Sequence, residues 1–158
     1  EGMILDAVVA QSEAQRAEMW QRREAAAEIA LTRRPIVNND VAVPLDQVAV
    51  FLSRIHDRLN VLDKGAKELI VSHLGDGNVH YTVWPISQDP DVHDAIMEAV
   101  EDVVLDLGGS FSAAPGIGMP KLPSMAPRKN KVALAPMPAL KRALDPNGLL
   151  TPGTVLPS

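Results

Sequence analysis

At 158 residues and 46% hydrophobic content, the chain is long enough for one domain with a substantial core. Its formal net charge of -5, without any long basic run, argues against nucleic acid as a partner. The absence of cysteine excludes disulfides and thiolate ligands, and is typical of a cytoplasmic protein. Because no apolar run approaches the ~20 residues of a membrane span and no targeting segment is visible, we expect a cytoplasmic location without membrane contact.

The first predicted element is a long helix. Residues 1–11 are apolar and fit either a buried strand or an extended lead-in. Ser12 and Gln15 match the S-x-x-Q capping box, and helix-forming residues continue to about Arg33. Pro35 ends the helix because the residue before a proline avoids helical dihedral angles. Side chains spaced i, i+3 and i+4 share one of its faces: Trp20, Arg23 and Glu24.

The middle of the chain predicts a strand, a helix and a hairpin. Residues 40–43 read as a short strand, and Pro44 opens a helix. The apolar stripe of that helix consists of Val48, Phe51, Leu52, Ile55 and Leu59. Residues 67–74 and 78–84 are two β-forming runs that meet at Gly-Asp-Gly-Asn, which favours an antiparallel hairpin.

The last third contains one clear helix and then many prolines. Residues 89–107 are amphipathic, with inward positions at Val92, Ile96, Val100, Val103 and Leu107. Residues 113–138 hold six prolines, so we expect loop with short helical turns, followed by a final helix over 139–144. We therefore predict an α+β fold: an antiparallel sheet with helices packed on one face and a proline-rich C-terminal segment.

The hairpin carries two histidines whose role the spacing leaves open. A two-residue turn at Asp76 and Gly77 would place His73 directly opposite His80, with β-carbons ~4.5–5.5 Å apart. Two imidazoles at that distance suit a shared divalent cation, although such sites usually add a third protein ligand. The alternative is a pair of cross-strand histidines on a polar face without a ligand.

The hairpin sequence, S-H-L-G-D-G-N-V-H-Y over residues 72–81, resembles the G-H-x-G-D-G-N-x-H motif of the C-terminal domain of FAD-linked oxidases. This family includes D-2-hydroxyglutarate dehydrogenase, D-lactate dehydrogenase and glycolate oxidase subunits. Four further stretches resemble family segments in the same order: Ala10–Gln15 with Trp20, Arg23 and Glu24; Asp40–Pro44; Gly108–Lys121; and Asp145–Gly153. The resemblance thus covers nearly the whole chain.

The resemblance implies the substrate side of a flavin-dependent oxidoreductase. In this family a separate domain binds FAD, and the C-terminal cap domain contacts a D-2-hydroxy acid that is oxidised to the 2-oxo acid. By position, His73 and His80 would be ligands of Zn or a similar ion, and Arg23 would bind the substrate carboxylate. Asn78 would face both the flavin and the substrate. The implied partners are a small 2-hydroxy acid and the FAD domain.

The chain departs from the family pattern at two places. Ala114 and Pro115 stand where the family has Glu-His, so the third metal ligand and the catalytic base of the family are both missing. Asn38 and Asn39 stand where dicarboxylate-using members carry a lysine, which argues against hydroxyglutarate in particular. We therefore expect weak zinc binding and identify no catalytic base.

The chain contains no glycine-rich segment of the kind that binds flavin phosphates. Residues 1–158 are therefore interpreted as a partial cap domain of a longer enzyme, inactive by itself. The alternative is a degenerate, stand-alone cap that binds a small acid, a metal or a partner chain without catalysis. Because an incomplete domain leaves apolar surface uncovered, self-association through a sheet edge into a homo-oligomer is also expected.

Overall fold

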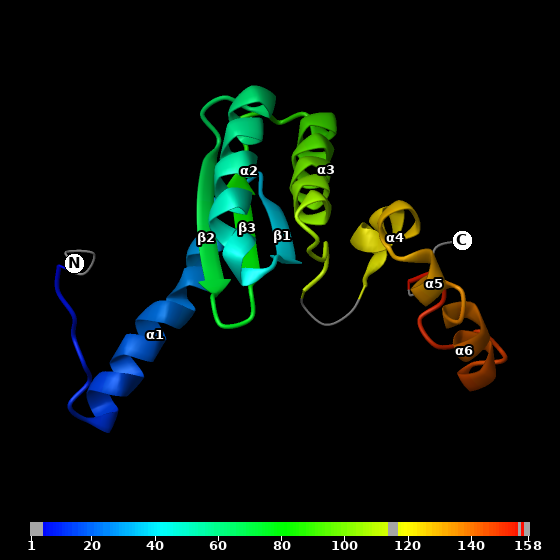
Figure 1. The fold of residues 1–158 in the computed structure, drawn as a ribbon, viewed down its shortest axis with the longest axis horizontal. Coiled ribbons are helices and arrows are strands. Elements are labelled where there is room, and N and C mark those ends of the chain that lie inside the picture. Colours follow the sequence, from blue (N-terminus) through cyan, green and yellow to red (C-terminus); the bar gives the residue numbers. More distant parts are fainter. Residues whose placement is uncertain (1–4, 114–116, 155, 157–158) are drawn as a thin grey trace.

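The computed structural model describes residues 5–113, 117–154 and 156. Its centre is a three-stranded antiparallel sheet in the order β1-β3-β2, with β1 at Val37–Ala42, β2 at Lys67–His73 and β3 at Asn78–Trp84. Helices α2 (Val48–Leu62) and α3 (Pro90–Asp106) cover one face of the sheet (Figure 1). The predicted α+β class is confirmed, and these two helices pack on one face of the antiparallel sheet as expected.

The covered face of the sheet and the two helices enclose the hydrophobic core. Every second residue of a strand points toward these helices, because strand side chains alternate between the two faces. The core consists of Val37, Val41, Val43, Val79, Tyr81 and Val83 from the sheet and its flank; Val48, Phe51, Ile55 and Leu59 from α2; and Ile96, Ala99, Val100, Val103 and Val104 from α3. The predicted stripes are confirmed, with Leu52, Val92 and Leu107 packed at the margin.

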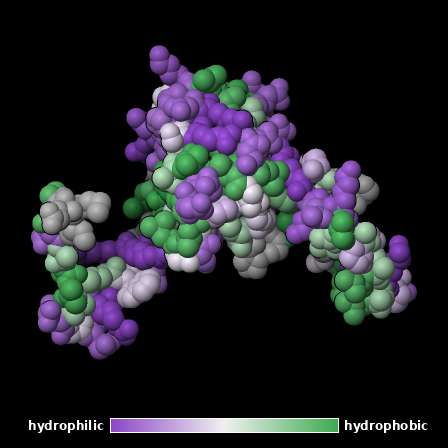
Figure 2. All heavy atoms as spheres, viewed as in Figure 1, coloured by the Kyte–Doolittle hydropathy of each residue, from purple (hydrophilic) through white to green (hydrophobic). Residues whose placement is uncertain are grey.

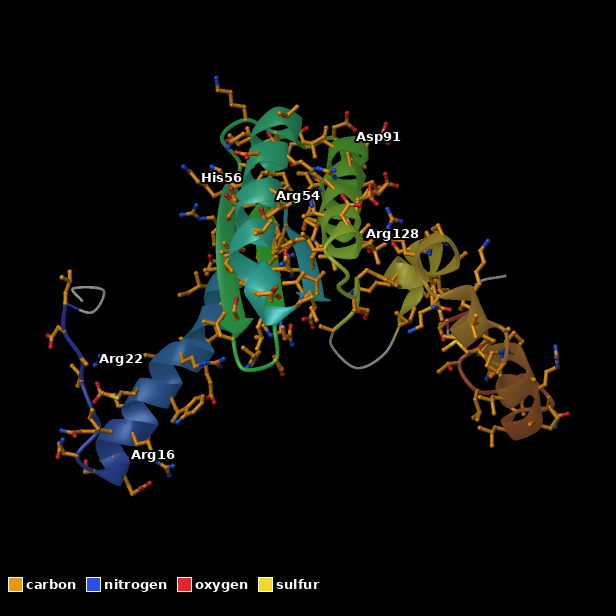
Figure 3. The ribbon with its side chains drawn as sticks, viewed as in Figure 1. Arg16, Arg22, Arg54, His56, Asp91 and Arg128 are labelled. Carbon is orange, nitrogen blue, oxygen red and sulfur yellow. The ribbon has the colours of Figure 1, made fainter. Side chains whose placement is uncertain are left out.

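A carboxylate at the edge of this core ties α2 to the outer strand β2. The phenol of Tyr81 donates to Glu68 Oε1 at 2.5 Å, and His56 Nδ1 lies 2.6 Å from Glu68 Oε2. Burial raises the pKa of Tyr81, so the phenol remains a donor. The hydrogen bond to Glu68 raises the pKa of His56, which lies on α2 beside β2 (Figure 3).

Helix α1 (Glu13–Ala30) starts close to the predicted position and extends away from the sheet (Figure 1). Ser12 Oγ accepts the N–H of Gln15 at 3.2 Å, as in a capping box. The Gln15 side chain, however, accepts the N–H of Gln11 and not that of Ser12. The helix ends near residue 30, somewhat before the proline that we expected to stop it.

The C-terminal end of α1 is fixed to the sheet by Trp84, the last residue of β3. The indole Nε1 donates to Ala30 O at 3.0 Å. The guanidinium of Arg33 lies 5.1 Å from the centre of the same indole ring, within the range of a cation–π contact. Trp84 therefore contacts both the last residue of α1 and the segment that follows it, where the helix meets the sheet.

Strand β1 is longer than predicted, because its first three residues also find partners. Val37 pairs with Val83, and the pairing continues to Ala42 opposite Asn78. After Pro44, a 3-10 turn at Leu45–Gln47 precedes α2, so the predicted helix starts a few residues late.

The proline-rich segment contains short helical turns, as predicted. These are η2 (Met119–Lys121), α4 (Leu122–Arg128), α5 (Lys131–Leu134) and α6 (Met137–Leu144). Figure 2 shows apolar residues over these C-terminal helices, and the exposed leucines there include Leu140, Leu144, Leu149 and Leu150. In the part of the chain that the structure describes, no helix is long and apolar enough to cross a membrane.

Helix α4 docks on α3 through a buried carboxylate. Ser124 Oγ donates to Glu101 Oε2 at 2.7 Å, and Arg128 lies against both Glu101 and Asp102. Burial raises the pKa of Glu101 even though these partners favour its ionised form. The contact attaches the C-terminal helices to the sheet-and-helix body.

Candidate functional site

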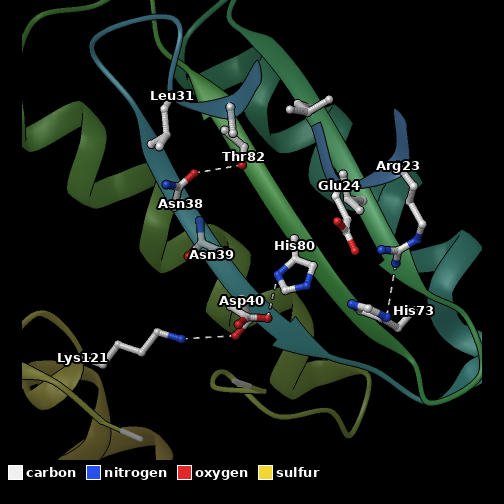
Figure 4. Close-up of a pocket in the computed structure, with 13 residues that line it drawn as sticks. Arg23, Glu24, Leu31, Asn38, Asn39, Asp40, His73, His80, Thr82 and Lys121 are labelled. Atoms are coloured by element: carbon white, nitrogen blue, oxygen red, sulfur yellow. Dashed lines mark hydrogen bonds and ion pairs between the residues drawn. The ribbon is translucent and has the colours of Figure 1, made fainter. Parts of the chain in front are cut away.

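The face of the sheet opposite α2 and α3 bears a cavity of about 610 Å³ (Figure 4). Its walls come from the C-terminal half of α1 and from all three strands. The lining residues are Arg23, Glu24, Ala30, Leu31, Asn38, Asn39, Asp40, Leu69, Val71, His73, His80, Thr82 and Lys121. The cavity thus gathers three of the residues singled out in the sequence, which are Arg23, His73 and His80.

The hairpin has a different register from the predicted one. A four-residue loop replaces the two-residue turn, so His73 pairs with Asn78, and His80 pairs with Val71. The prediction that the two histidines stand directly opposite each other is wrong. The register differs by two residues, which leaves both histidines on one face because side chains alternate along a strand. Their rings lie edge to face with centroids 5.4 Å apart.

A tertiary contact explains this register. Gly77 has a φ of +73°, and its carbonyl accepts the N–H of Val43 at 3.1 Å. A β-carbon at this position would lie 2.0 Å from the Val43 carbonyl oxygen, so only glycine fits. Asp76 Oδ1 also accepts the N–H of Asn78 at 3.1 Å. The segment after β1 therefore fixes the loop, and the hairpin sequence alone carries no sign of that contact.

Arg23 reaches the hairpin from α1. One of its terminal nitrogens lies 3.4 Å from His73 Nδ1, although the two residues are far apart in the chain. A guanidinium only donates hydrogen bonds, so His73 Nδ1 can take part in this contact only as the acceptor. The guanidinium carbon also lies 5.5 Å from the centre of the Trp20 ring. The shared helix face predicted for these two α1 residues therefore brings them into contact.

His80 has an acidic neighbour that the sequence analysis did not identify. Asp40 pairs with His80 across β1 and β3, and its Oδ1 lies 3.2 Å from His80 Nδ1. That oxygen is buried and has no aligned hydrogen bond, so the contact is an ion-pair distance only. The alternation of β1 indicates which of its residues share a face, but only the register between strands reveals this pairing.

Asn78 pairs with Ala42 on one side and with His73 on the other. Its Oδ1 atom is buried, and among the described residues no donor reaches it. A buried amide oxygen without a partner is costly and calls for an explanation such as a bound group. The buried Oδ1 atom therefore fits the expectation that Asn78 faces a ligand.

The glycine-rich segment after α3 runs along the outer edge of β1. Ser110 forms a two-way bridge with Ala42, and the N–H of Ala113 donates to Asp40 O at 3.0 Å. Lys121 Nζ donates to the carbonyls of Asp40 and Phe111 at 3.2 and 3.1 Å, and burial lowers the pKa of its ammonium. The departures at residues 114–115 lie outside the described residues.

The donor set of the cavity does not match a divalent metal ion. Among the described residues, no three His, Asp or Glu side chains converge as a metal site would require. Arg23 faces Nδ1 of His73, and Asp40 faces Nδ1 of His80, so each ring offers only its Nε2 atom. Two imidazole nitrogens alone are an incomplete set for zinc.

Comparison with known proteins identifies the family. The family model described as "FAD linked oxidases, C-terminal domain" matches residues 1–155. The chain belongs to this family. The predicted resemblance is confirmed, and the hairpin, the Asp40 segment and the Gly108–Lys121 segment are therefore parts of one FAD-linked oxidase C-terminal domain.

Curated relatives of this FAD-linked oxidase domain are dehydrogenases. It is 30% identical over 98% of its length to a D-2-hydroxyglutarate dehydrogenase of Stutzerimonas stutzeri, and 29% identical over 99% to a mitochondrial one of Arabidopsis thaliana. It is 31% identical over 95% to a mitochondrial protein of Schizosaccharomyces pombe named as a D-lactate dehydrogenase. The chain spans only 34%, 27% and 30% of these three proteins. Since two of them are mitochondrial, a cytoplasmic location stays a prediction.

Proposed function

We propose that residues 1–158 are the substrate-side domain of an FAD-dependent oxidoreductase that converts a D-2-hydroxy acid into the 2-oxo acid. The observation that carries the proposal is the convergence of Arg23, His73 and His80 at one cavity. Membership of the FAD-linked oxidase family supplies the reaction class. The three side chains come from α1 and both strands of the hairpin, so their meeting depends on the complete fold.

Arg23 is the proposed binding group for the substrate carboxylate. In the structure its guanidinium lies near the Trp20 ring and makes a long, 3.4 Å contact to a ring nitrogen of His73. A carboxylate would replace this long contact with shorter, bidentate hydrogen bonds between two oppositely charged groups. Glu24, the next residue of α1, also lines the cavity, so a bound acid would approach from the Arg23 side to avoid repulsion.

His80 is proposed to hold the substrate hydroxyl. Asp40 lies at Nδ1 of this imidazole, which leaves Nε2 for a hydrogen bond to a ligand in the cavity. Oxidation transfers a hydride from the α-carbon to FAD when FAD is bound, and Nε2 of His80 is the atom placed to accept the hydroxyl proton. The buried and unpartnered Oδ1 of Asn78 supports a place for this residue beside the flavin and the substrate.

The test replaces Arg23 in the full-length flavoprotein that contains this domain. Arg23→Met removes the charged hydrogen bonds to the carboxylate, so kcat/KM for a D-2-hydroxy acid should fall roughly 10- to 100-fold. The matched control is Arg22→Met on the same helix, because Arg22 pairs with Glu18 on the surface and does not line the cavity. Equal losses in both variants would contradict the proposed role.

A non-catalytic cap is the second candidate, favoured by the incomplete metal-ligand set of the described residues. In that case the chain binds a 2-hydroxy acid through Arg23, but the bound acid is not oxidised and no flavin is reduced. Strand β2 is an outer strand of the described sheet, and self-association would use its edge. A monomer in gel filtration at high protein concentration would contradict the self-association.

A further inference from the structure

The cavity has two ends of opposite character (Figure 4). At one end lie its charged and imidazole side chains, namely Arg23, Glu24, Asp40, His73, His80 and Lys121. At the other end lie Asn38, Leu69 and Thr82 of the sheet. Ala30, the last residue of α1, and Leu31 after it complete this end. A ligand held by its carboxylate at the first end must place its remaining atoms toward the second.

The strand register gives the separation of the two ends. Val71 pairs with His80, and Leu69 pairs with Thr82 two residues farther along the strands. Two residues of an antiparallel strand span about 6.8 Å. A substrate whose α-carbon lies beside the histidines would therefore reach the second end with a short side chain.

The polar atoms of the second end are partly satisfied by one another. Thr82 Oγ1 donates to Asn38 Oδ1 at 2.9 Å. Leu31 and Leu69 add apolar surface on either side of this pair. This end of the cavity therefore resembles an aliphatic wall with one internal hydrogen bond.

No lysine or arginine of the described residues lines this second end. Lys121 donates to the carbonyls of Asp40 and Phe111, so its ammonium is already engaged at the first end. Arg33 lies over the ring of Trp84 and outside the cavity. A second carboxylate in the ligand would lose its hydration here without gaining a cation.

We propose that the cavity selects 2-hydroxy acids with an uncharged aliphatic side chain and discriminates against dicarboxylic ones. This inference rests on the proposed function and adds the substrate class. The head group of the acid lies at Arg23 and His80, and its alkyl chain contacts Leu31 and Leu69. The preference is opposite to the one that the names of several relatives would suggest, since they are hydroxyglutarate dehydrogenases.

The first experiment compares D-lactate, D-2-hydroxypentanoate and D-2-hydroxyglutarate as reductants of the flavin in the full-length protein. Each added methylene that is buried should raise kcat/KM about fourfold, so hydroxypentanoate should exceed lactate. Hydroxyglutarate should be at least about tenfold poorer than hydroxypentanoate, because its second carboxylate is desolvated without a partner. Fastest reduction by hydroxyglutarate overturns the inference but leaves the proposed function intact. Reduction by none of the three acids contradicts the proposed function itself.

The second experiment introduces a cation at the aliphatic end. Leu69→Lys on the outer strand β2 should shift the ratio of kcat/KM values toward hydroxyglutarate by about tenfold or more. Leu69→Gln is the matched control, because it adds polarity without charge and should leave the ratio nearly unchanged. The same ratio in both variants would show that substrate side chains do not reach Leu69, and would overturn the inference.

Discussion

The two faces of the sheet have the same strands and very different chemistry. The face under α2 and α3 presents Val41, Val79, Tyr81 and Val83, all fully buried against helix residues. The opposite face presents Asp40, His80, Thr82 and Val71 to a cavity that only part of α1 covers. The covered face stabilises the fold. The open face holds side chains whose presence the stability of the fold does not explain.

The difference separates the residues that stabilise this domain from those that line its candidate site. Hydrophobic burial specifies the covered face, so its residues are exchangeable for others of similar shape and polarity. On the open face, the identity of each side chain depends on what enters the cavity.

The largest effect is expected at the covered face. Phe51→Ala removes a fully buried ring that packs edge to face on Tyr81, with ring centroids 6.0 Å apart. The free energy of unfolding should fall by about 3–5 kcal/mol. His80→Ala on the open face should change it by less than about 1 kcal/mol. Urea denaturation followed by circular dichroism measures both, and similar losses would contradict the division between the faces.

Gly77 connects the hairpin to the segment after β1, and its replacement should be the next most damaging. Gly77→Ala places a methyl group 2.0 Å from the Val43 carbonyl oxygen in a left-handed backbone conformation. The expected loss of stability is about 2–3 kcal/mol. Gly75→Ala in the same loop is the control, because a β-carbon there meets nothing within 4 Å. Comparable denaturation midpoints for the two variants would refute the explanation of the register.

The attachment of α1 to the sheet depends on Trp84. Trp84→Phe keeps an aromatic ring but removes the hydrogen bond to Ala30 O, at a cost of about 1 kcal/mol. Amide hydrogen exchange in the C-terminal half of α1 should then become about fivefold faster. Trp20→Phe is the control on the helix itself, since Trp20 is half exposed. Unchanged exchange in Trp84→Phe would mean that other contacts hold the helix.

The incomplete donor set of the open face predicts weak zinc binding. After dialysis, metal analysis should find clearly less than one zinc ion per chain, because His73 and His80 lack a third ligand among the described residues. Full occupancy that disappears in His73→Ala would contradict this expectation. It would mean that a further ligand joins the two histidines.

The smallest effect is a pH dependence at the margin of the covered face. The hydrogen bond with Glu68 raises the pKa of His56 above its ordinary value of 6.5. Its stabilising contribution is therefore fully present below 6.5 and is lost as the pH rises through the raised value. His56→Gln should flatten this part of the profile of urea midpoint against pH. An unchanged profile would exclude His56 as its source.

Much of the covered face could be predicted from the sequence. The apolar spacing in 48–59 and 92–107 identifies two helices and their buried sides, because a helix places every third or fourth residue on one face. The hairpin strands follow from two β-forming runs around a glycine-rich turn. These signals are local, and each depends on residues within one element.

The arrangement of the open face could not be predicted in the same way. The contact of Asp40 with His80 depends on the register between β1 and β3, and the turn at Gly77 depends on Val43. The role of Lys121 depends on two carbonyl groups, one of them 81 residues earlier in the chain. The contact of Asp40 with His80 depends on register and leaves no periodic pattern in the sequence. The contacts to carbonyl groups leave none either, because a main-chain group accepts a hydrogen bond whatever its side chain.

The anchoring of the glycine-rich segment has a consequence for how such domains diverge. Ala113 binds the Asp40 carbonyl through its own N–H, and Lys121 binds the same carbonyl through its ammonium. Both flanks of positions 114 and 115 are therefore attached to one strand, and at Ala113 the attachment uses the backbone alone. Point mutations between these anchors exchange side chains without altering the anchors themselves. Substitutions at these two positions should therefore leave the attachments of Ala113 and Lys121 to β1 in place.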